Sequence, residues 1–431
     1  MKQSWLRFDF ILFFTVLALL GFGLAMIYST TLYPTQSPSL FGSPVFRQGL
    51  VAAVGVILIL ILTFVDYGVL GYHPLGVLSP ITRRRQEPAG LGLSLHHEQY
   101  SKVEREPGGL SIKDSLLLLI EGLSNPFYVL ALALLFAVSV VGKSSLGAQR
   151  WIDLRFFDLQ PSEVAKLMVI IALARYLADH EDTIHDLRHL LVSIVQVAIP
   201  VLMIARQPDL GTALTIMAIW LAMVIMAGIP WRHLLLLALS GLAALPVVWT
   251  HWLSDYQRER LLIFMNPQLD PLGAGYNLIQ SRISVGAGGL LGRGLNSGTQ
   301  SQLNFLRIQH TDYIFSVLAE ELGFIGAALL IALYCLLIMQ ALTIAANSRD
   351  TFGRLIASGV AGMIVFQVFI NIGMNIGLSP VTGIPLPFIS YGRSSLFVLL
   401  ISMGILESIA WRRKEQEHRH TTIELEVDTI S

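Results

Sequence analysis

The chain has 431 residues, of which 54% are apolar and only 13% are charged. Soluble globular proteins carry about 25% charged residues, so the composition excludes an ordinary soluble protein and predicts an integral membrane protein. The net charge of zero argues against nucleic acid as a partner, and the single cysteine, Cys335, excludes a disulfide framework or a thiolate metal site. We expect Cys335 to pack within its apolar run.

Ten apolar segments are long enough to cross about 30 Å of hydrocarbon. In chain order they are 10–30, 48–65, 126–142, 164–180, 189–205, 210–230, 233–253, 313–345, 355–377 and 388–410. The first is too long for the apolar region of a cleaved signal peptide, and no small-x-small cleavage site follows it. The predicted fold is therefore an all-α integral membrane protein of ten transmembrane helices, with residues 1–431 forming a single polytopic domain.

An even number of spans places both termini on one side of the membrane. Slightly more than half of the 29 lysines and arginines fall in the segments that are inside if the N-terminus is inside, which favours cytoplasmic termini. Residues 67–125 then form a cytoplasmic insertion, in which DSLLLLIEGL predicts an amphipathic helix on the membrane surface. Residues 254–312 form a large extracytoplasmic loop between spans seven and eight, and residues 411–431 a polar, mobile cytoplasmic tail.

Four groups of polar residues lie near the predicted outer ends of the spans, where polar groups are costly and suggest a site. The first is Arg47-Gln48, at the start of the second span. The second is GAQRWIDLRFFDLQPSEVAKL (147–167), in which Pro161 suits the first turn of a helix. Glu163 and Lys166 are three residues apart and can pair on one helical face, either as a structural salt bridge or as part of a site.

The third group is RQPDLGTAL (206–214), in which Asp209 is placed to cap the sixth span; capping alone would explain this residue. The fourth combines the 254–312 loop, with Asp270, and NIGLSPVTGIPLPFISYGRSS (375–395). The prolines and glycines of the latter predict a fixed, non-helical passage, which is tolerated at membrane depth only where backbone lines a cavity.

An outer cavity with carboxylates and cations that opens on the bilayer suits a lipid carrying a phosphate or pyrophosphate. Cations would hold the diphosphate, and a carboxylate could act as general base towards a hydroxyl nucleophile. The residues alone leave open whether such a lipid is transported or reacts.

Five motifs, in this order, carry a resemblance to a known family: GAQRWIDL…LQPSEVAKL, RQPDLGTAL, DPLGAGYNLIQSRISVGAGGLLGRG, HTDYIFSVLAEELGFIG and SPVTGIPLPFISYG. Together they resemble the SEDS family (shape, elongation, division and sporulation) of ten-span membrane proteins. The resemblance extends from the first span to the tenth and leaves out only the insertion near 67–120 and the tail. The His310–Asp312 triplet is typical of the elongation subfamily, RodA, rather than of the division subfamily, FtsW.

The resemblance implies a peptidoglycan glycosyltransferase of the bacterial cytoplasmic membrane, active in cell elongation and shape maintenance. Such an enzyme polymerises lipid II on the outer face: the 4-hydroxyl of an acceptor lipid II attacks the anomeric carbon of the growing chain, and undecaprenyl pyrophosphate leaves. Asp270 is the implied catalytic base, with a neutral Lys166 as the alternative.

The resemblance also implies substrate-binding residues. By charge, Arg47, Lys166 and Arg282 are assigned to the pyrophosphate and Glu163 to positioning Lys166. The remaining substrate-binding residues on this reading are Asp209, Ser390 and Tyr391. The sequence contains no dedicated metal cage, although a divalent cation (Mg²⁺ or Mn²⁺) would help to neutralise a departing pyrophosphate.

The implied partner is a class B penicillin-binding protein, a transpeptidase that cross-links the glycan strands. Alternatives are a lipid II flippase, an FtsW-like division enzyme, and a scaffold without catalysis. The sequence departs from the family pattern at Arg393, where relatives have glycine, and at Arg307-Ile308, where relatives tend to have Pro-Glu. The insertion could contact cytoplasmic shape-determining proteins or be a solvated loop.

Overall fold

The computed structural model describes residues 7–31, 43–71, 112–145, 148–153, 158–273, 275–303, 305–306 and 310–430. The α-helices in these ranges are α1 (Phe10–Thr31), α2 (Pro44–Phe64), α3 (Ile112–Leu123), α4 (Pro126–Val141), α5 (Pro161–Asp179), α6 (Leu187–Ala205), α7 (Leu210–Met226), α8 (Trp231–Val247), α9 (Asp255–Met265), α10 (Tyr276–Ala287), α11 (Thr299–Gln302), α12 (Ile314–Ala346), α13 (Thr351–Ile376) and α14 (Arg393–Ile430). A small antiparallel sheet joins β1 (Lys143–Ser145), β2 (Ala148–Asp153) and β3 (Asp158–Leu159) in that order.

Each of the ten segments predicted to span the membrane overlaps a helix, although the last, 388–410, becomes helical only at Arg393. Seven helices in the described part of the chain are long and apolar enough to cross a bilayer, and α4 and α7 are shorter apolar helices. The α5 helix is less apolar because it contains Glu163, Lys166, Arg175 and Asp179. The prediction of a mostly helical, multi-pass membrane protein is confirmed.

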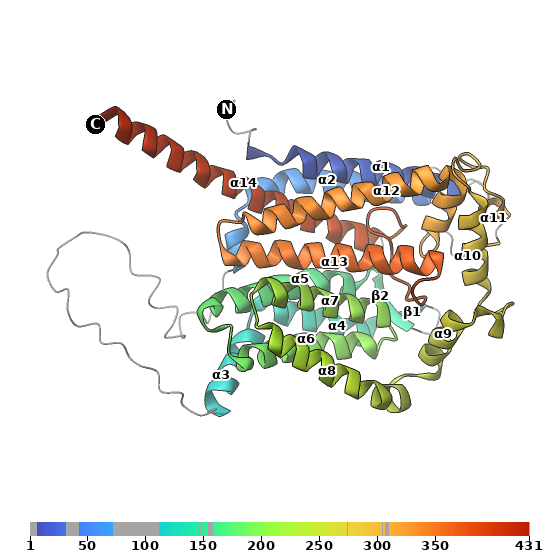
Figure 1. The fold of residues 1–431 in the computed structure, drawn as a ribbon, viewed down its shortest axis with the longest axis horizontal. Helices are drawn as coiled ribbons and strands as arrows, with labels where there is room; N and C mark the ends of the chain where they lie inside the picture. The colour runs from blue at the N-terminus through green and yellow to red at the C-terminus, as the bar shows by residue number, and fades with distance from the viewer. Residues whose placement is uncertain are drawn as a thin grey trace.

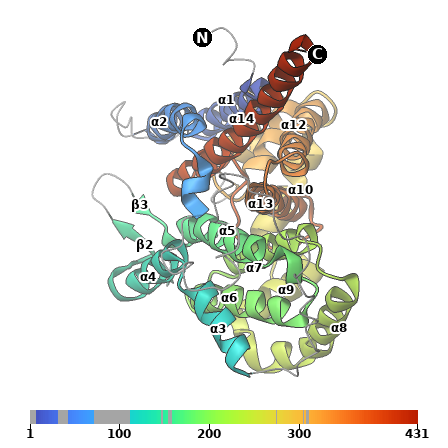
Figure 2. The same cartoon turned by 90° about the vertical axis from the view of Figure 1, so that its left-hand side faces the viewer.

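The long helices run back and forth along one axis, so that the connections collect at two ends (Figure 1). The sheet, α9, α10 and α11 lie at one end, and α3 and the outer part of α14 lie at the other. Seen along this axis, α5 and α13 are central, with α1, α2, α12 and α14 on one side and α4, α6 and α7 on the other (Figure 2). None of the residues of α8 is buried, and this helix lies at the edge of the bundle.

The mobility of the tail stays a prediction, and in the structure α14 continues without a break to Ile430 and leaves the bundle (Figure 1). Cys335 is exposed on α12 rather than packed inside, since its helix face lies on the outside of the bundle, where lipid would take the place of protein neighbours. The helix predicted within the insertion is α3; residues 72–111 of the insertion lie outside the described residues.

The α2 and α14 helices form a tightly joined pair. Arg412 of α14 donates to the carbonyl oxygens of Thr63 at 3.2 Å and Phe64 at 3.1 Å. The last carbonyls of a helix have no partner within it, so Arg412 caps α2 from a neighbouring helix. Its Nε also lies 3.1 Å from Oδ1 of Asp66, which fixes the turn that follows α2.

Residues 377–392, between α13 and α14, form the irregular passage that the prolines and glycines predict; we call them the 377–392 loop. The loop begins at Gly377, whose left-handed conformation (φ 81°) ends α13 and requires a residue without Cβ strain. Its backbone groups form hydrogen bonds with side chains of the surrounding helices and of the loop itself. The Asn371 amide donates to Ile384 O at 2.8 Å, the Tyr334 hydroxyl donates to Pro387 O, and the Leu386 N–H donates to the Ser390 hydroxyl at 2.8 Å.

The first helix packs against this loop at one glycine. A Cβ added at Gly23 would lie 2.2 Å from the carbonyl oxygen of Phe388 and 3.0 Å from Cα of Ile389. Both atoms belong to the backbone, and Phe388 itself has a positive φ of 64°, which is strained for a residue other than glycine. The loop backbone therefore cannot move away from α1 to make room for a larger residue at position 23.

We predict that Gly23→Ala destabilises the protein by about 1–3 kcal/mol, the usual cost of overpacking, because the new methyl group must displace loop backbone. Thermal unfolding in detergent measures the effect. Gly21→Ala on the same helix is the matched control, since a Cβ there meets nothing within 4 Å. Equal melting temperatures for the two variants would contradict the predicted close approach.

Candidate active site

Asp270 lies in the short turn between the 3₁₀ turn Pro267–Leu269 and α10, and its side chain is half-buried. Its Oδ1 accepts a hydrogen bond from the N–H of Gly273 at 3.0 Å, and its carbonyl accepts from the N–H of Gly275 at 3.0 Å. A Cβ at position 273 would lie 2.1 Å from Oδ2 of Asp270. The glycines of this turn thus make room for the carboxylate itself, which the backbone holds in a fixed, accessible position.

The helices on both sides of this turn are attached to the 377–392 loop. Arg260 of α9 donates to the carbonyl oxygen of Val381 at 3.1 Å. Arg282 of α10 donates to the carbonyl oxygen of Gly377 at 3.4 Å, and its guanidinium lies where a Cβ of residue 377 would be. The Asp270 turn is therefore held from both ends against the loop.

Glu163 and Lys166 form a buried ion pair in the first turns of α5. Lys166 Nζ lies 2.9 Å from Glu163 Oε1, and the two side chains are only 2% and 3% exposed. Pro161 occupies the first position of the helix, as predicted. The predicted pairing is confirmed, and its burial means that each charge depends on the other.

Asp209 caps α7, as the sequence predicts. Its Oδ1 accepts from the N–H of Thr212 at 3.2 Å, and its Oδ2 accepts from the Thr212 hydroxyl at 3.0 Å. A Cβ at Gly211 would lie 2.7 Å from the carbonyl oxygen of Thr382. The start of α7 is therefore packed directly on the 377–392 loop.

Ser390 and Tyr391 lie at the end of the loop, beside the start of α2. The Ser390 hydroxyl donates to Thr311 O at 2.7 Å, and the Ser390 carbonyl accepts from the Gln48 amide at 3.3 Å. The N–H of Tyr391 donates to His310 O at 2.9 Å. The hydrogen bonds of Ser390 are thus made to the backbone around it. Arg47, next to Gln48, is exposed at the same end of the bundle.

The loop brings the predicted residues into one region. Arg282 contacts its first residue, the Asp209 cap lies at its middle, and Ser390 and Tyr391 form its end beside Arg47. The Glu163–Lys166 pair is linked to it through Gln160, whose N–H donates to the Ser394 hydroxyl at 3.1 Å. The same region holds Asp270 between its two anchored helices.

Asp312 also belongs to this region and was not among the predicted site residues. A Cβ at Gly383 would lie 3.8 Å from its Oδ2. Burial raises the pKa of the Asp312 carboxyl, while the nearby guanidinium groups of Arg260 and Arg150 oppose the rise. The sequence signal was the His310–Asp312 triplet, which served only to separate subfamilies.

The metal prediction stays open. In the described ranges, His, Cys, Asp and Glu form no group of three or more that could hold an ion.

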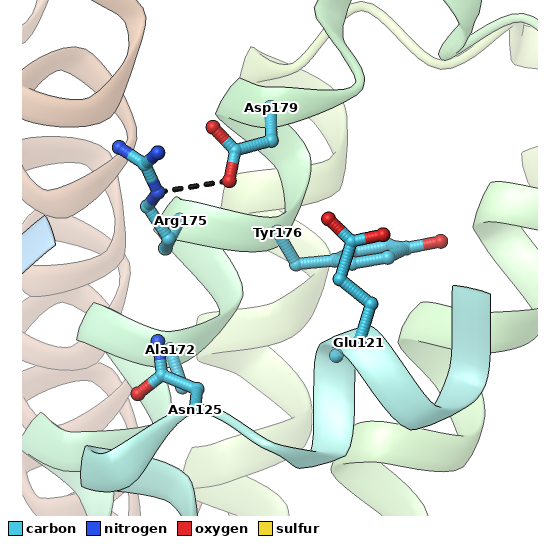
Figure 3. Close-up of a pocket in the computed structure, with 7 residues that line it drawn as sticks. Glu121, Asn125, Ala172, Arg175, Tyr176 and Asp179 are labelled. Atoms are coloured by element: carbon cyan, nitrogen blue, oxygen red, sulfur yellow. Dashed lines mark ion pairs between the residues drawn. The ribbon is translucent and has the colours of Figure 1, made fainter. Parts of the chain in front are cut away.

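A small pocket lies at the other end of α5 (Figure 3). Its lining includes Glu121, Asn125, Ala172, Arg175, Tyr176 and Asp179. Arg175 Nε and Asp179 Oδ2 are 2.8 Å apart across its rim. Arg175 is nine residues, roughly 14 Å, further along the helix than Lys166, so this pocket is separate from the region that contains the predicted site residues.

The chain is similar to proteins of a known family. The model of a family described as "Cell cycle protein" (FTSW_RODA_SPOVE) matches residues 116–415. The chain is 45% identical over 294 residues to the peptidoglycan glycosyltransferase MrdB of Escherichia coli strain K12, covering 68% of this chain and 79% of that protein. It is 40% identical over 286 residues to a probable peptidoglycan glycosyltransferase FtsW of Trichlorobacter lovleyi, covering 66% and 74% of the two chains.

Two solved structures have the same fold. One belongs to a study of the structural coordination of polymerisation and cross-linking by a peptidoglycan synthase complex, with a TM-score of 0.70, 30% identity, and coverage of 95% of this chain and 99% of that chain. The other is the rod shape determining protein RodA of Thermus thermophilus, with a TM-score of 0.60, 28% identity, and coverage of 95% and 98%.

We predict that Glu163→Ala lowers the free energy of unfolding by about 3–5 kcal/mol, because it leaves the Lys166 ammonium buried without its partner. Replacing both residues, by Glu163→Leu and Lys166→Met, should restore stability close to that of the wild type. Chemical unfolding in detergent measures both.

Asp179→Ala is the control, since it breaks a more exposed pair on the same helix and should cost at most about 1 kcal/mol. If Glu163→Ala lowers the free energy of unfolding no more than the control does, water must reach Lys166.

Proposed function

The chain belongs to the FtsW/RodA/SpoVE family of cell cycle proteins, and we propose from this premise that it is a peptidoglycan glycosyltransferase that polymerises lipid II during cell elongation. Because the chain belongs to this family and contains long apolar helices, it is a multi-pass protein of the bacterial inner membrane. The observation that carries the proposal is the attachment of the Asp270 turn, through Arg260 and Arg282, to the loop on which the other predicted residues converge. The 45% identity to MrdB supports the elongation role over the division role.

In the proposed reaction, Asp270 takes the proton from the 4-hydroxyl of the acceptor lipid II. The oxygen then forms a bond to the anomeric carbon of the growing strand, and the bond from that carbon to undecaprenyl pyrophosphate breaks. The half-buried carboxylate, fixed by the Gly273 N–H, supports this role because a general base must reach a proton at hydrogen-bond distance. Lys166 donates to Glu163 at 2.9 Å, so in this arrangement it is a donor and Asp270 is the better base.

The leaving pyrophosphate requires cations. We assign this task to Lys166, which Glu163 holds, and to the exposed Arg47 at the same end of the bundle. Arg282 donates to Gly377 O through one nitrogen, which leaves its other N–H groups to face an anion. Asp209 and Tyr391 would contact the sugar, and Ser390 would act through the backbone it organises.

A divalent cation would neutralise part of the pyrophosphate charge. Mg²⁺ is commonly bound by one or two carboxylates together with substrate phosphates, so it would arrive with the substrate and be held by Asp270 or Asp209. The described residues do not form a cage for it, and no step above depends on it.

The proposed topology has ten spans and cytoplasmic termini, with 254–312 as the extracytoplasmic catalytic loop. It is supported by the position of α9, α10 and α11 at the end of the bundle opposite α3 (Figure 1). The proposed partner is a class B penicillin-binding protein, because one structure with the same fold comes from a peptidoglycan synthase complex that coordinates polymerisation and cross-linking.

We predict that Asp270→Asn lowers the rate of lipid II polymerisation by about 10²–10⁴-fold, the usual contribution of a general base, while lipid II binding is retained. The assay is the formation of glycan strands from labelled lipid II by purified protein, alone and with its transpeptidase.

The control is Asp255→Asn, a fully exposed carboxylate in the first turn of α9, which should leave the rate unchanged. Flipping of lipid II by both wild type and Asp270→Asn, with no polymer from either, would favour the flippase alternative. If the Asp270→Asn enzyme is active, another residue must be the general base.

A further inference from the structure

Arg393, the first residue of α14, pairs with Asp158 on β3. The next residue strengthens this junction: the Ser394 hydroxyl donates to Asp158 O at 2.6 Å and accepts from the Gln160 N–H at 3.1 Å. Two polar contacts of Asp158 and one of Gln160, the residue after β3, therefore join the end of the small sheet to the first turn of α14. We call this set the β3–α14 junction.

The junction lies between two parts of the candidate site, the start of α5 and the end of the 377–392 loop. On one side, Gln160 is the residue before α5, and Lys166 lies five residues, roughly 7.5 Å, beyond the first residue of that rigid helix. On the other side, Arg393 follows Tyr391 and Gly392, whose N–H groups donate to His310 O and Gln48 Oε1. A shift at the junction would move Lys166 relative to the end of the 377–392 loop.

The ion pair itself is too exposed to be a major source of folding stability. The Asp158 side chain is 47% exposed and that of Arg393 is 16% exposed, and pairs of this kind contribute little to stability in water. The pairing of β2 with β3 is also short, since among the described residues it consists of Ile152–Leu159 and Asp153–Asp158. The orientation of the β3 end thus depends on its contacts with α14.

We propose that Arg393 is a positioning residue of the active site, which acts through Asp158 to hold the start of α5, and with it Lys166, in register with the 377–392 loop. This proposal rests on the proposed function for its catalytic consequence. The guanidinium pairs with a carboxylate of the protein itself, and the proposed role of this pair is alignment of the site. Misplacing a catalytic group by about 1 Å can lower a rate 10²-fold, so a weak contact can have a large effect on turnover.

The test uses the purified full chain with its transpeptidase and measures kcat, KM for lipid II and melting temperature. Arg393→Gln and Asp158→Asn should each lower kcat about tenfold through misalignment, with KM and melting temperature almost unchanged. The charge-swapped double variant, Arg393→Asp with Asp158→Arg, should recover most of the lost kcat, since directly coupled residues are not additive. Asp179→Asn, which breaks an ion pair at the far end of α5 (Figure 3), is the matched control and should match the wild type.

Three results would overturn the proposal. A raised KM in Arg393→Gln with a normal Asp158→Asn enzyme would make Arg393 a substrate ligand. Losses of kcat that parallel losses of melting temperature would show that the pair has only a structural role. A charge-swapped variant with a kcat no higher than that of the single variants would show that the two residues are not coupled.

A second measurement separates this proposal from the proposed function. Hydrogen exchange of the amides of residues 164–166 should be faster in Asp158→Asn than in the wild type and unchanged in Asp179→Asn. If the wild type forms no polymer, the proposed function fails, and the exchange rates still decide whether the pair holds α5. Unchanged exchange in Asp158→Asn would overturn the proposal.

Discussion

The structure depends on how the backbone of the 377–392 loop is hydrogen-bonded. A loop between two helices of a membrane protein has N–H and C=O groups that lipid cannot satisfy. Here they are satisfied by side chains of the surrounding helices, such as Asn371, Tyr334 and Gln48. Each of these contacts is also a distance constraint between the loop and a helix. The requirement to bond the backbone therefore places the polar ends of the helices around one region.

Charge is distributed around this region in two ways. Glu163 and Lys166 are buried and mutually dependent, whereas Asp270 is half-buried in a turn and its carboxylate accepts a hydrogen bond from the Gly273 N–H. The first arrangement fixes a cation at the cost of desolvation. The second leaves a carboxylate within reach of a substrate. A polymerase that must hold a diphosphate and activate a hydroxyl needs one group of each kind.

Hydropathy was sufficient to predict the helices, because long apolar runs leave no other hydrogen-bonded structure in a bilayer. Local spacing was sufficient for the Glu163–Lys166 pair and for the Asp209 cap, since both partners lie within three residues. Contacts across long sequence distances could not be predicted. The Arg282–Gly377 and Arg393–Asp158 contacts join residues 95 and 235 positions apart, and only the packing of the helices brings them together. Likewise, the part of α14 that leaves the bundle has no apolar pattern from which a helix could be predicted.

The anchors of the 377–392 loop are directed at its main chain. Arg260, Arg282 and Gln48 bind the carbonyl oxygens of Val381, Gly377 and Ser390, and each of these oxygens exists whatever side chain the residue carries. Many side-chain replacements within the loop would therefore leave these anchors in place during evolution. The insertion or deletion of a single residue would instead offset every anchor beyond it at once. These main-chain anchors thus constrain the length of the segment more directly than they constrain its side chains.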